Sequence, residues 1–274
     1  MNDHRFWKPN RGQCRPQRWA ACLLTAATIW SAGIASAHDD VRPKVVANKI
    51  VTDGHDDGTG IDTPNVRVFG YDLGEEDPVG DPYAAADPGF NALPTSGFVK
   101  GSNLVFTILS GSQFGLPATL TYWDGAGSPN FVAVPNSETL RLNLGGLNST
   151  AGTGNSDVAG YSLGTNNSSD PLHVHLASFL QGPDGNSDPT DGGNPADGIY
   201  LIALGLTTNM PGVAGSEPLF IVYNAGMSEE IHDAAIDYVG ATLVPEPSSL
   251  LLLAVGSVGL ITAARRKKWP IFRR

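Results

Sequence analysis

Two histidines separated by one residue form the pattern in this chain that is best suited to chemistry. His173 and His175 lie in the apolar stretch Leu172–Leu180, which predicts a strand. Residues two apart in a strand point to the same face of a sheet, so both imidazoles share one face. Two neighbouring neutral imidazoles chelate Zn²⁺ or Cu²⁺ once a third ligand joins them. The spacing is also compatible with two polar residues on a solvated strand face, so metal binding and no metal both stay open.

A third ligand for this pair must come from elsewhere in the sequence. His232 is one candidate, because it lies on the flank of the apolar stripe of a predicted helix. His38 and His55 are others, since two aspartates follow each of them.

A second candidate cation site is an acidic turn rich in side-chain oxygens. Asp184, Asn186 and Asp188 occupy positions 1, 3 and 5 of a segment that resembles the start of a calcium loop, and Asp191 follows them. Pro189 stands where an EF-hand loop needs glycine. The segment is therefore predicted to be either a weak Ca²⁺ site or an ordinary acidic surface turn.

No motif of a hydrolase is present. The sequence contains neither a Gly-x-Ser-x-Gly elbow nor a His-Glu-x-x-His helix. Aromatic residues at Tyr122, Trp123 and Phe131 suit a sugar-stacking platform, although aromatic side chains in strands more often pack into a core. We therefore expect a protein without catalytic activity, with a secreted carbohydrate-active enzyme as the third alternative.

The N-terminus predicts a signal peptide over residues 1–37. Basic residues from Arg5 to Arg18 precede the mostly apolar segment Trp19–Ile34. Ala35 and Ala37 then supply the small residues that signal peptidase requires. We expect transport through the Sec translocon and cleavage before His38.

The C-terminus has three parts that suit a membrane anchor. The motif Val244, Pro245, Glu246 and Pro247 is followed by an apolar run at about residues 248–264, which predicts a single transmembrane helix. Four cations close the run and should stay in the cytoplasm: Arg265, Arg266, Lys267 and Lys268.

This C-terminal layout, over residues 244–274, resembles the PEP-CTERM sorting signal of Gram-negative bacteria. The resemblance implies export, retention in the inner membrane through the tail, and processing by an exosortase near the Pro-Glu-Pro motif. It also implies an association with exopolysaccharide production and a final location at the cell surface or outside the cell.

The segment between the two ends is strongly acidic. Residues 38–244 hold six basic and 25 acidic residues, a formal charge near −19. Such a surface repels phosphate backbones, so we expect no nucleic-acid partner. Both cysteines, Cys14 and Cys22, lie in the leader, so the exported segment has no disulfide and no thiolate ligand.

The elements that must position the candidate site are short strands, because the exported segment is rich in Gly, Pro, Asn, Asp and Ser. We expect strands at 44–51, 66–73, 98–109, 118–123, 131–134, 139–144, 172–180, 198–208 and 218–224, with loops at 74–94 and 145–169. The strand at 198–208 is apolar on both faces, which predicts a central, doubly covered position. One helix should begin after Ser228, an N-cap residue. The prediction for residues 38–243 is one all-β domain, an antiparallel β-sandwich with one short C-terminal helix.

A second resemblance concerns the histidine pair. His173 and His175, followed by Phe179, Gly198 and Tyr200, look like the His-x-His…Phe…Gly-x-Tyr pattern of bacterial surface-anchored domains. Some of those families, including a PEP-CTERM family, are linked to zinc handling. The resemblance implies a periplasmic or surface protein that binds Zn or Cu, the main alternative to a surface or matrix protein without metal.

Overall fold

The computed structural model describes residues 39–56, 58–75, 80–166, 172–188, 190 and 192–244. These residues belong to one compact unit. Several sequence predictions lie outside them: the cleavage site at Ala35 and Ala37, His38, Asp191, Pro245 to Pro247, the apolar run 248–264 and the cations Arg265 to Lys268. Within the described part of the chain, no helix is long and apolar enough to cross a membrane.

The described residues are mostly β-structure. The strands are β1 (Asp39–Val46), β2 (Lys49–Asp56), β3 (Ile61–Thr63), β4 (Val68–Asp72), β5 (Ala84–Ala85), β6 (Gly89–Ala92), β7 (Asn103–Ile108), β8 (Thr121–Trp123), β9 (Val132–Ala133), β10 (Thr139–Leu144), β11 (Leu147–Ala151), β12 (Val158–Thr165), β13 (Leu172–His175), β14 (Ala177–Gln181), β15 (Gly198–Thr208) and β16 (Leu219–Ala225). A 3₁₀ turn, η1 (Gly111–Phe114), and one helix, α1 (Glu229–Thr242), complete the fold. The predicted mostly-β fold with one short C-terminal helix is confirmed.

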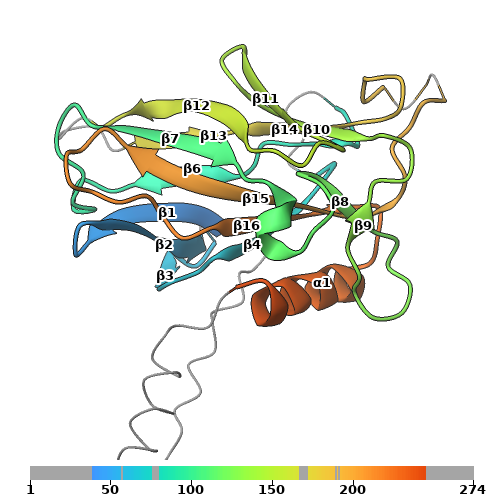
Figure 1. Ribbon diagram of the computed structural model, residues 1–274, viewed down its shortest axis with the longest axis horizontal. Coiled ribbons are helices and arrows are strands. Elements are labelled where there is room, and N and C mark those ends of the chain that lie inside the picture. Colours follow the sequence, from blue (N-terminus) through green and yellow to red (C-terminus); the bar gives the residue numbers. More distant parts are fainter. Residues whose placement is uncertain are drawn as a thin grey trace, which may run out of the picture. The chain divides into compact units, whose positions relative to one another are not determined.

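The strands form three sheets (Figure 1). One has the order β13-β6-β1-β2-β3, a second has β11-β10-β14-β5, and the third runs β12-β7-β15-β16-β4 with β8 and β9 attached beside β15. The predicted antiparallel arrangement holds for the other pairs of named strands, but it is wrong for β1 with β6 and for β16 with β4, which are parallel. Each parallel pair joins strands that are far apart in the chain, a pairing that no tight hairpin can make.

One core cluster joins apolar side chains from all three sheets. It includes Val41 and Phe90 of the first sheet, Leu140 of the second, and Phe106 and Ile202 of the third. All five side chains are almost inaccessible to solvent. Burial of this shared apolar surface is the main force that holds the sheets together.

The other face of the third sheet is covered by α1, which lies along β16 and β4 in Figure 1. A second core cluster fills this contact, with Ile199 and Phe220 from the sheet and Ala235, Ile236 and Val239 from the helix. The strand predicted at 198–208 is therefore covered on both faces, as its apolar pattern indicates.

Residues 44–51 and 145–169 differ from the sequence prediction because their turns were not recognised. Residues 44–51 are not one strand but the tip of the β1–β2 hairpin, in which Ala47 and Asn48 both have positive φ, at 49° and 61°. Two central residues with positive φ make the turn that best matches the twist of paired strands. The hairpin extends β1 back to Asp39, and this extension creates the candidate site.

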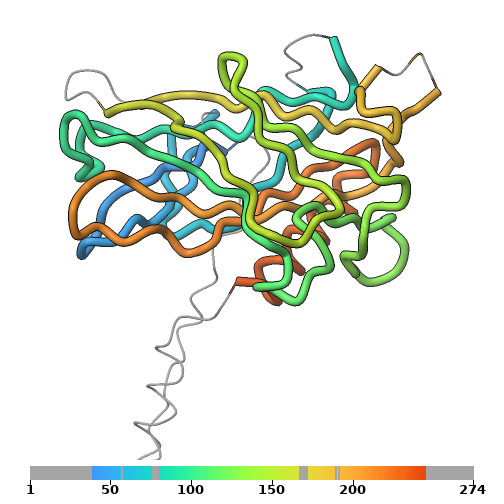
Figure 2. The backbone as a smooth tube through the Cα atoms, turned by 45° about the horizontal axis from the view of Figure 1, so that its top comes forward, coloured from blue at the N-terminus to red at the C-terminus, as the bar shows by residue number. Residues whose placement is uncertain are grey.

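The stretch 145–169, predicted to have little structure, contains β11 and β12. Gly145 and Gly146, with φ of 57° and 90°, turn the chain so that β11 pairs with β10. This turn projects from the body of the molecule in Figure 2. The acidic loop at 74–94 likewise contains β5 and β6. Phe90 of β6 is fully buried, and its burial fixes that short strand in the core.

The predicted strand 172–180 is divided between two sheets. β13 pairs with β6 in the first sheet, whereas β14 pairs with β10 in the second. The chain changes sheets at Leu176, whose side chain is fully buried and whose N–H donates to the carbonyl of Pro88. The two histidines therefore belong to the first sheet only.

Candidate metal centre

Two imidazoles lie side by side on the outer face of β13. Val174 packs against the core cluster, so His173 and His175 point to the opposite face. Their Nε2 atoms are 3.1 Å apart. Their side chains are 47% and 41% exposed. The prediction that both imidazoles point to the same face of a strand is confirmed.

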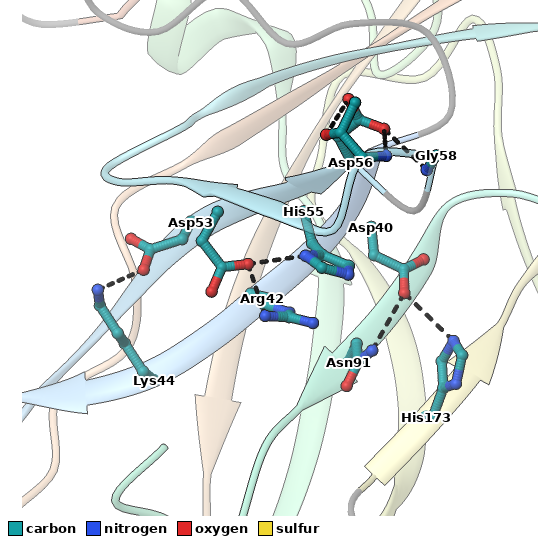
Figure 3. Close-up of polar contacts among 11 residues, drawn as sticks. Asp40, Arg42, Lys44, Asp53, His55, Asp56, Gly58, Asn91 and His173 are labelled. Atoms are coloured by element: carbon teal, nitrogen blue, oxygen red, sulfur yellow. Dashed lines mark hydrogen bonds and ion pairs between the residues drawn. The ribbon is translucent and has the colours of Figure 1, made fainter. Parts of the chain in front are cut away.

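A third donor comes from Asp40, near the start of β1. Strand β6 lies between β13 and β1, and the carboxylate lies across it. Oδ2 is 3.2 Å from Nε2 of His173, and Oδ1 is 3.9 Å from Nε2 of His175. Figure 3 shows this carboxylate between His173 and Asn91, whose amide donates to Oδ2 at 3.4 Å. The Asp40 side chain is only 2% exposed, so it is a buried charge beside two exposed imidazoles.

The separations of the three donors suit a single metal ion. Two ligands bound tetrahedrally to Zn²⁺ at about 2.0–2.2 Å lie about 3.3–3.6 Å apart. The separations of 3.1 Å and 3.2 Å are close to this range. All three donor atoms lie within 4.8 Å of one another. Two imidazoles and one carboxylate would leave a fourth position for water or a ligand.

A second carboxylate orients His175. Oδ1 of Asp87 lies 3.3 Å from Nδ1 of His175. In a neutral imidazole, a proton on Nδ1 leaves the Nε2 lone pair available to a metal, and metal-bound histidines commonly have a carboxylate partner of this kind. The hydrogen bond to Asp87, together with the nearby charges of Asp40 and Asp87, raises the pKa of His175, although burial opposes the shift.

The position of Asp87 is itself fixed from the core. The hydroxyl of Ser178 donates to the backbone carbonyl of Asp87, and the Tyr223 hydroxyl lies 2.8 Å from the same Ser178 oxygen. Burial is the main cause that raises the pKa of Tyr223, so its hydroxyl stays protonated and donates. A chain of hydrogen bonds thus links the core to the group that orients His175.

Gly89 provides the space that the carboxylate of Asp40 occupies. A Cβ atom at this position would lie 1.8 Å from Oδ1 of Asp40 and 2.9 Å from Cε1 of His175. Any side chain on residue 89 would therefore displace the carboxylate from the imidazoles. Glycine at this position in β6 is a requirement of the cluster rather than of the strand.

A shallow groove of about 220 Å³ lies on this side of the first sheet, and its lining includes Asn91, the residue that donates to Asp40. Ion pairs line it, between Arg42 and Asp62 and between Lys44 and Asp53. Figure 3 shows Arg42, Lys44 and Asp53 on the same side of the sheet as Asp40. The groove is thus a polar surface that borders the cluster through Asn91.

Two of the three histidines proposed as third ligands, His55 and His232, have different partners in the structure. His55 lies opposite Asp40 in the β1–β2 pair, but its Nδ1 contacts Asp62 at 2.7 Å. His232 is not brought to the pair. It is fully buried between α1 and the third sheet, with Nε2 3.1 Å from the carbonyl of Val222. The apolar face of α1 packs against the third sheet, whereas His173 and His175 lie on the first sheet. His232 is therefore separated from the histidine pair.

The acidic turn forms a series of local hydrogen bonds. Side-chain oxygens of Asp184, Asn186 and Asp188 accept the backbone N–H groups of Asn186, Asp188 and Thr190, respectively. Each aspartate or asparagine thereby stabilises its own turn. Asp191, the fourth residue of the predicted calcium loop, lies outside the described residues.

The remaining residues of the His-x-His pattern have structural positions. Phe179 is on β14 beneath the guanidinium of Arg141, 4.3 Å from the ring centroid. Tyr200 is buried in the core, and its hydroxyl donates to the carbonyl of Ala196. Neither residue belongs to the group of donor atoms around His173 and His175.

Sequence reasoning missed Asp40 and Asp87 as members of the site. Polar and apolar residues alternate at Asp40, Val41 and Arg42. This alternation would have extended the first predicted strand toward the N-terminus. No local signal identifies Asp87, because only the pairing of β13 with β6 brings it near His175.

Comparison with known proteins identifies one segment of the chain. Residues 243–267 match the family model of the PEP-CTERM protein-sorting motif. The predicted sorting signal is thereby confirmed, and it marks the chain for export and for processing by an exosortase. No curated protein and no solved structure matches the chain.

Proposed function

We propose that this exported PEP-CTERM protein binds a divalent transition-metal ion, Zn²⁺ in the first instance, through Asp40, His173 and His175. The observation that carries the proposal is the convergence of three donor atoms within 4.8 Å of one another. Asp87, which orients His175, and Gly89, which admits the carboxylate, support it. A solvated strand face would need neither feature.

The chemistry of the donors favours zinc or copper over calcium. Imidazole nitrogens are ligands for zinc, copper, iron and nickel, whereas Ca²⁺ and Mg²⁺ prefer sets made of oxygen alone. The acidic exported segment, with its formal charge near −19, would attract cations toward the site. The likeness of the His-x-His segment to zinc-linked surface domains points in the same direction.

The proposed role is to bind metal at the cell surface or in the extracellular matrix, without catalysis. Both histidines are about half exposed on the outer face of a sheet, where a bound ion would be accessible from outside. After transport and signal-peptide removal, the C-terminal tail would hold the protein in the inner membrane until an exosortase processes it. Association with exopolysaccharide belongs to the same proposal.

Metal content and mature termini, measured on one sample, test this function. The processed protein is purified from its own cell envelope without a histidine tag, and mass spectrometry determines both ends. We expect close to one equivalent of Zn or Cu bound at the site formed by Asp40, His173 and His175. That equivalent should be lost in the His173→Ala/His175→Ala variant. His55→Ala is the matched control, because this histidine lies on the same face and pairs with Asp62.

Two results would contradict the proposal. A wild-type protein that contains no metal, and whose melting temperature does not change with added Zn²⁺, would leave a surface protein without metal as the interpretation. Equal metal content in the wild type and the double-histidine variant would locate the binding elsewhere.

A further inference from the structure

A second group of metal-type donors lies at the first turn of α1, on the other face of the third sheet. His232, Asp72 and Glu229 each place one donor atom within 4.8 Å of the other two. His232 and Glu229 come from the helix, and Asp72 from the end of β4. None of these residues belongs to the cluster around His173 and His175.

The imidazole of His232 is held in one orientation by the sheet below it. Its Nε2 lies 3.1 Å from the carbonyl oxygen of Val222, so this nitrogen carries the proton and donates. A Cβ atom on Gly70 would lie 2.5 Å from Cδ1 of Ile236 and 3.1 Å from Nε2 and Cε1 of His232, so glycine at position 70 makes room for both side chains. A backbone carbonyl on the far nitrogen is a common partner of metal-bound histidines.

The other nitrogen of the ring has no hydrogen-bond partner among the residues that the structure describes. Nδ1 of His232 is buried, and the whole residue is 0% exposed. It points toward Oδ1 of Asp72 at 3.6 Å, which is longer than the roughly 2.7–2.9 Å of a charged N–H···O bond. The same distance is at the upper end of the range, about 3.3–3.6 Å, that separates two donor atoms bound to one tetrahedral Zn²⁺.

The carboxylate of Asp72 is also held in place. The amide of Asn224 donates to Oδ1 of Asp72 at 2.6 Å, and the same side chain bonds the backbone of Met227 in both directions. Glu229 is exposed, whereas the side chain of Asp72 is 15% exposed. The group therefore has a rigid inner part and one ligand on the solvent side, where an ion would enter.

From this geometry we infer that Nδ1 of His232 and the carboxylates of Asp72 and Glu229 form a second divalent transition-metal site. A bound ion would connect the first turn of α1 to the end of β4. It would satisfy the buried nitrogen and offset the charge of two carboxylates. The positive end of the helix dipole opposes a cation here, and the two negative charges outweigh it.

Zinc binding to the His173→Ala/His175→Ala protein tests this second site, because that variant lacks the first one. We expect it to retain one Zn²⁺ per chain by equilibrium dialysis with metal analysis. Adding Asp72→Asn and Glu229→Gln should remove this ion. The control adds Asp233→Asn and Asp237→Asn instead, and it should keep the ion. These two exposed residues lie on the same helix, and their substitution removes the same number of negative charges.

Histidine ¹⁵N chemical shifts identify the nitrogen that binds. Zinc added to the double-histidine variant should shift Nδ1 of His232 and leave its Nε2 bonded to Val222. Absence of zinc from this variant would overturn the inference. Zinc retained after the Asp72 and Glu229 substitutions would overturn it equally. Melting temperatures of the metal-free variants, expected to match that of their parent, show that the fold is intact.

Discussion

At the scale of single residues, the cluster depends on a glycine. Because Gly89 does not have a positive φ, alanine is compatible with its backbone but not with the position of Asp40. We expect Gly89→Ala to weaken zinc binding by at least about tenfold, since the carboxylate must leave the imidazoles. Isothermal titration calorimetry with Zn²⁺ measures the effect.

The matched control for this substitution is Gly154→Ala. Gly154 has no positive φ, and apart from its own atoms and those of its two chain neighbours, no heavy atom of the described residues lies within 4 Å of the place that its Cβ would take. Alanine there should therefore leave zinc affinity unchanged. Wild-type affinity in Gly89→Ala would mean that Asp40 is not a ligand.

Protonation of His175 should affect the stability of the metal-free fold and the affinity for zinc in opposite directions. Its pKa is raised above the roughly 6.5 of an unfolded chain, chiefly by the hydrogen bond to Asp87. Protonated His175 therefore stabilises the metal-free fold below that pH, and this contribution is lost as the pH rises through the raised pKa. Zinc affinity should change in the other direction, falling by about tenfold per pH unit below the same pKa, because one proton competes with the metal.

The Asp87→Asn variant separates these effects. Removing the charge should lower the pKa of His175, so proton competition with zinc should begin at a lower pH than in the wild type. Zinc titrations at several pH values, with NMR titration of the His175 ring, provide the measurement. An unchanged pH profile in Asp87→Asn would show that Asp87 does not act on the metal-binding nitrogen.

At the scale of elements, the change of sheet at Leu176 separates residues that stabilise the fold from residues that bind. Leu176 is fully buried in the shared core, so Leu176→Ala should lower the free energy of unfolding by about 2–5 kcal/mol. The double variant His173→Ala/His175→Ala should change it by less than about 1 kcal/mol in the metal-free protein, since both side chains face solvent.

Urea unfolding followed by circular dichroism compares these variants. A loss of several kcal/mol in the metal-free double-histidine variant would show that the imidazoles contribute to the core. Their role as an exposed binding pair would then have to be abandoned.

At the scale of the whole molecule, the sorting signal at residues 243–267 and the acidic exported segment belong to one delivery route. The Pro-Glu-Pro motif is the predicted recognition element, so Glu246→Ala should prevent exosortase processing. We expect this variant to accumulate in the inner membrane with an intact C-terminus, while the wild type loses its tail. Fractionation and mass spectrometry of the C-terminal peptide measure the outcome.

A conservative Lys267→Arg change in the tail is the control, because it keeps the cationic end and leaves the motif untouched. Normal processing of Glu246→Ala would show that the glutamate is not required for recognition. The zinc-binding measurements on the exported segment would not be affected by either result.

The sequence by itself determined features that depend on neighbouring residues. Local composition predicted the sorting signal. Period-two and helical patterns predicted the shared face of His173 and His175, the doubly covered strand at 198–208 and the helix after Ser228. Even the missed hairpins had local signals, in Asn48 and in the Gly145-Gly146 pair.

Only the tertiary structure decided which residues complete the two candidate sites. Asp40 meets His173 because β6 pairs with β1 on one side and with β13 on the other. Asp72 meets His232 because α1 packs across β4 and β16. The free energy of such long-range pairings comes from apolar surface buried across the whole domain, so no local pattern specifies which polar side chains it brings together.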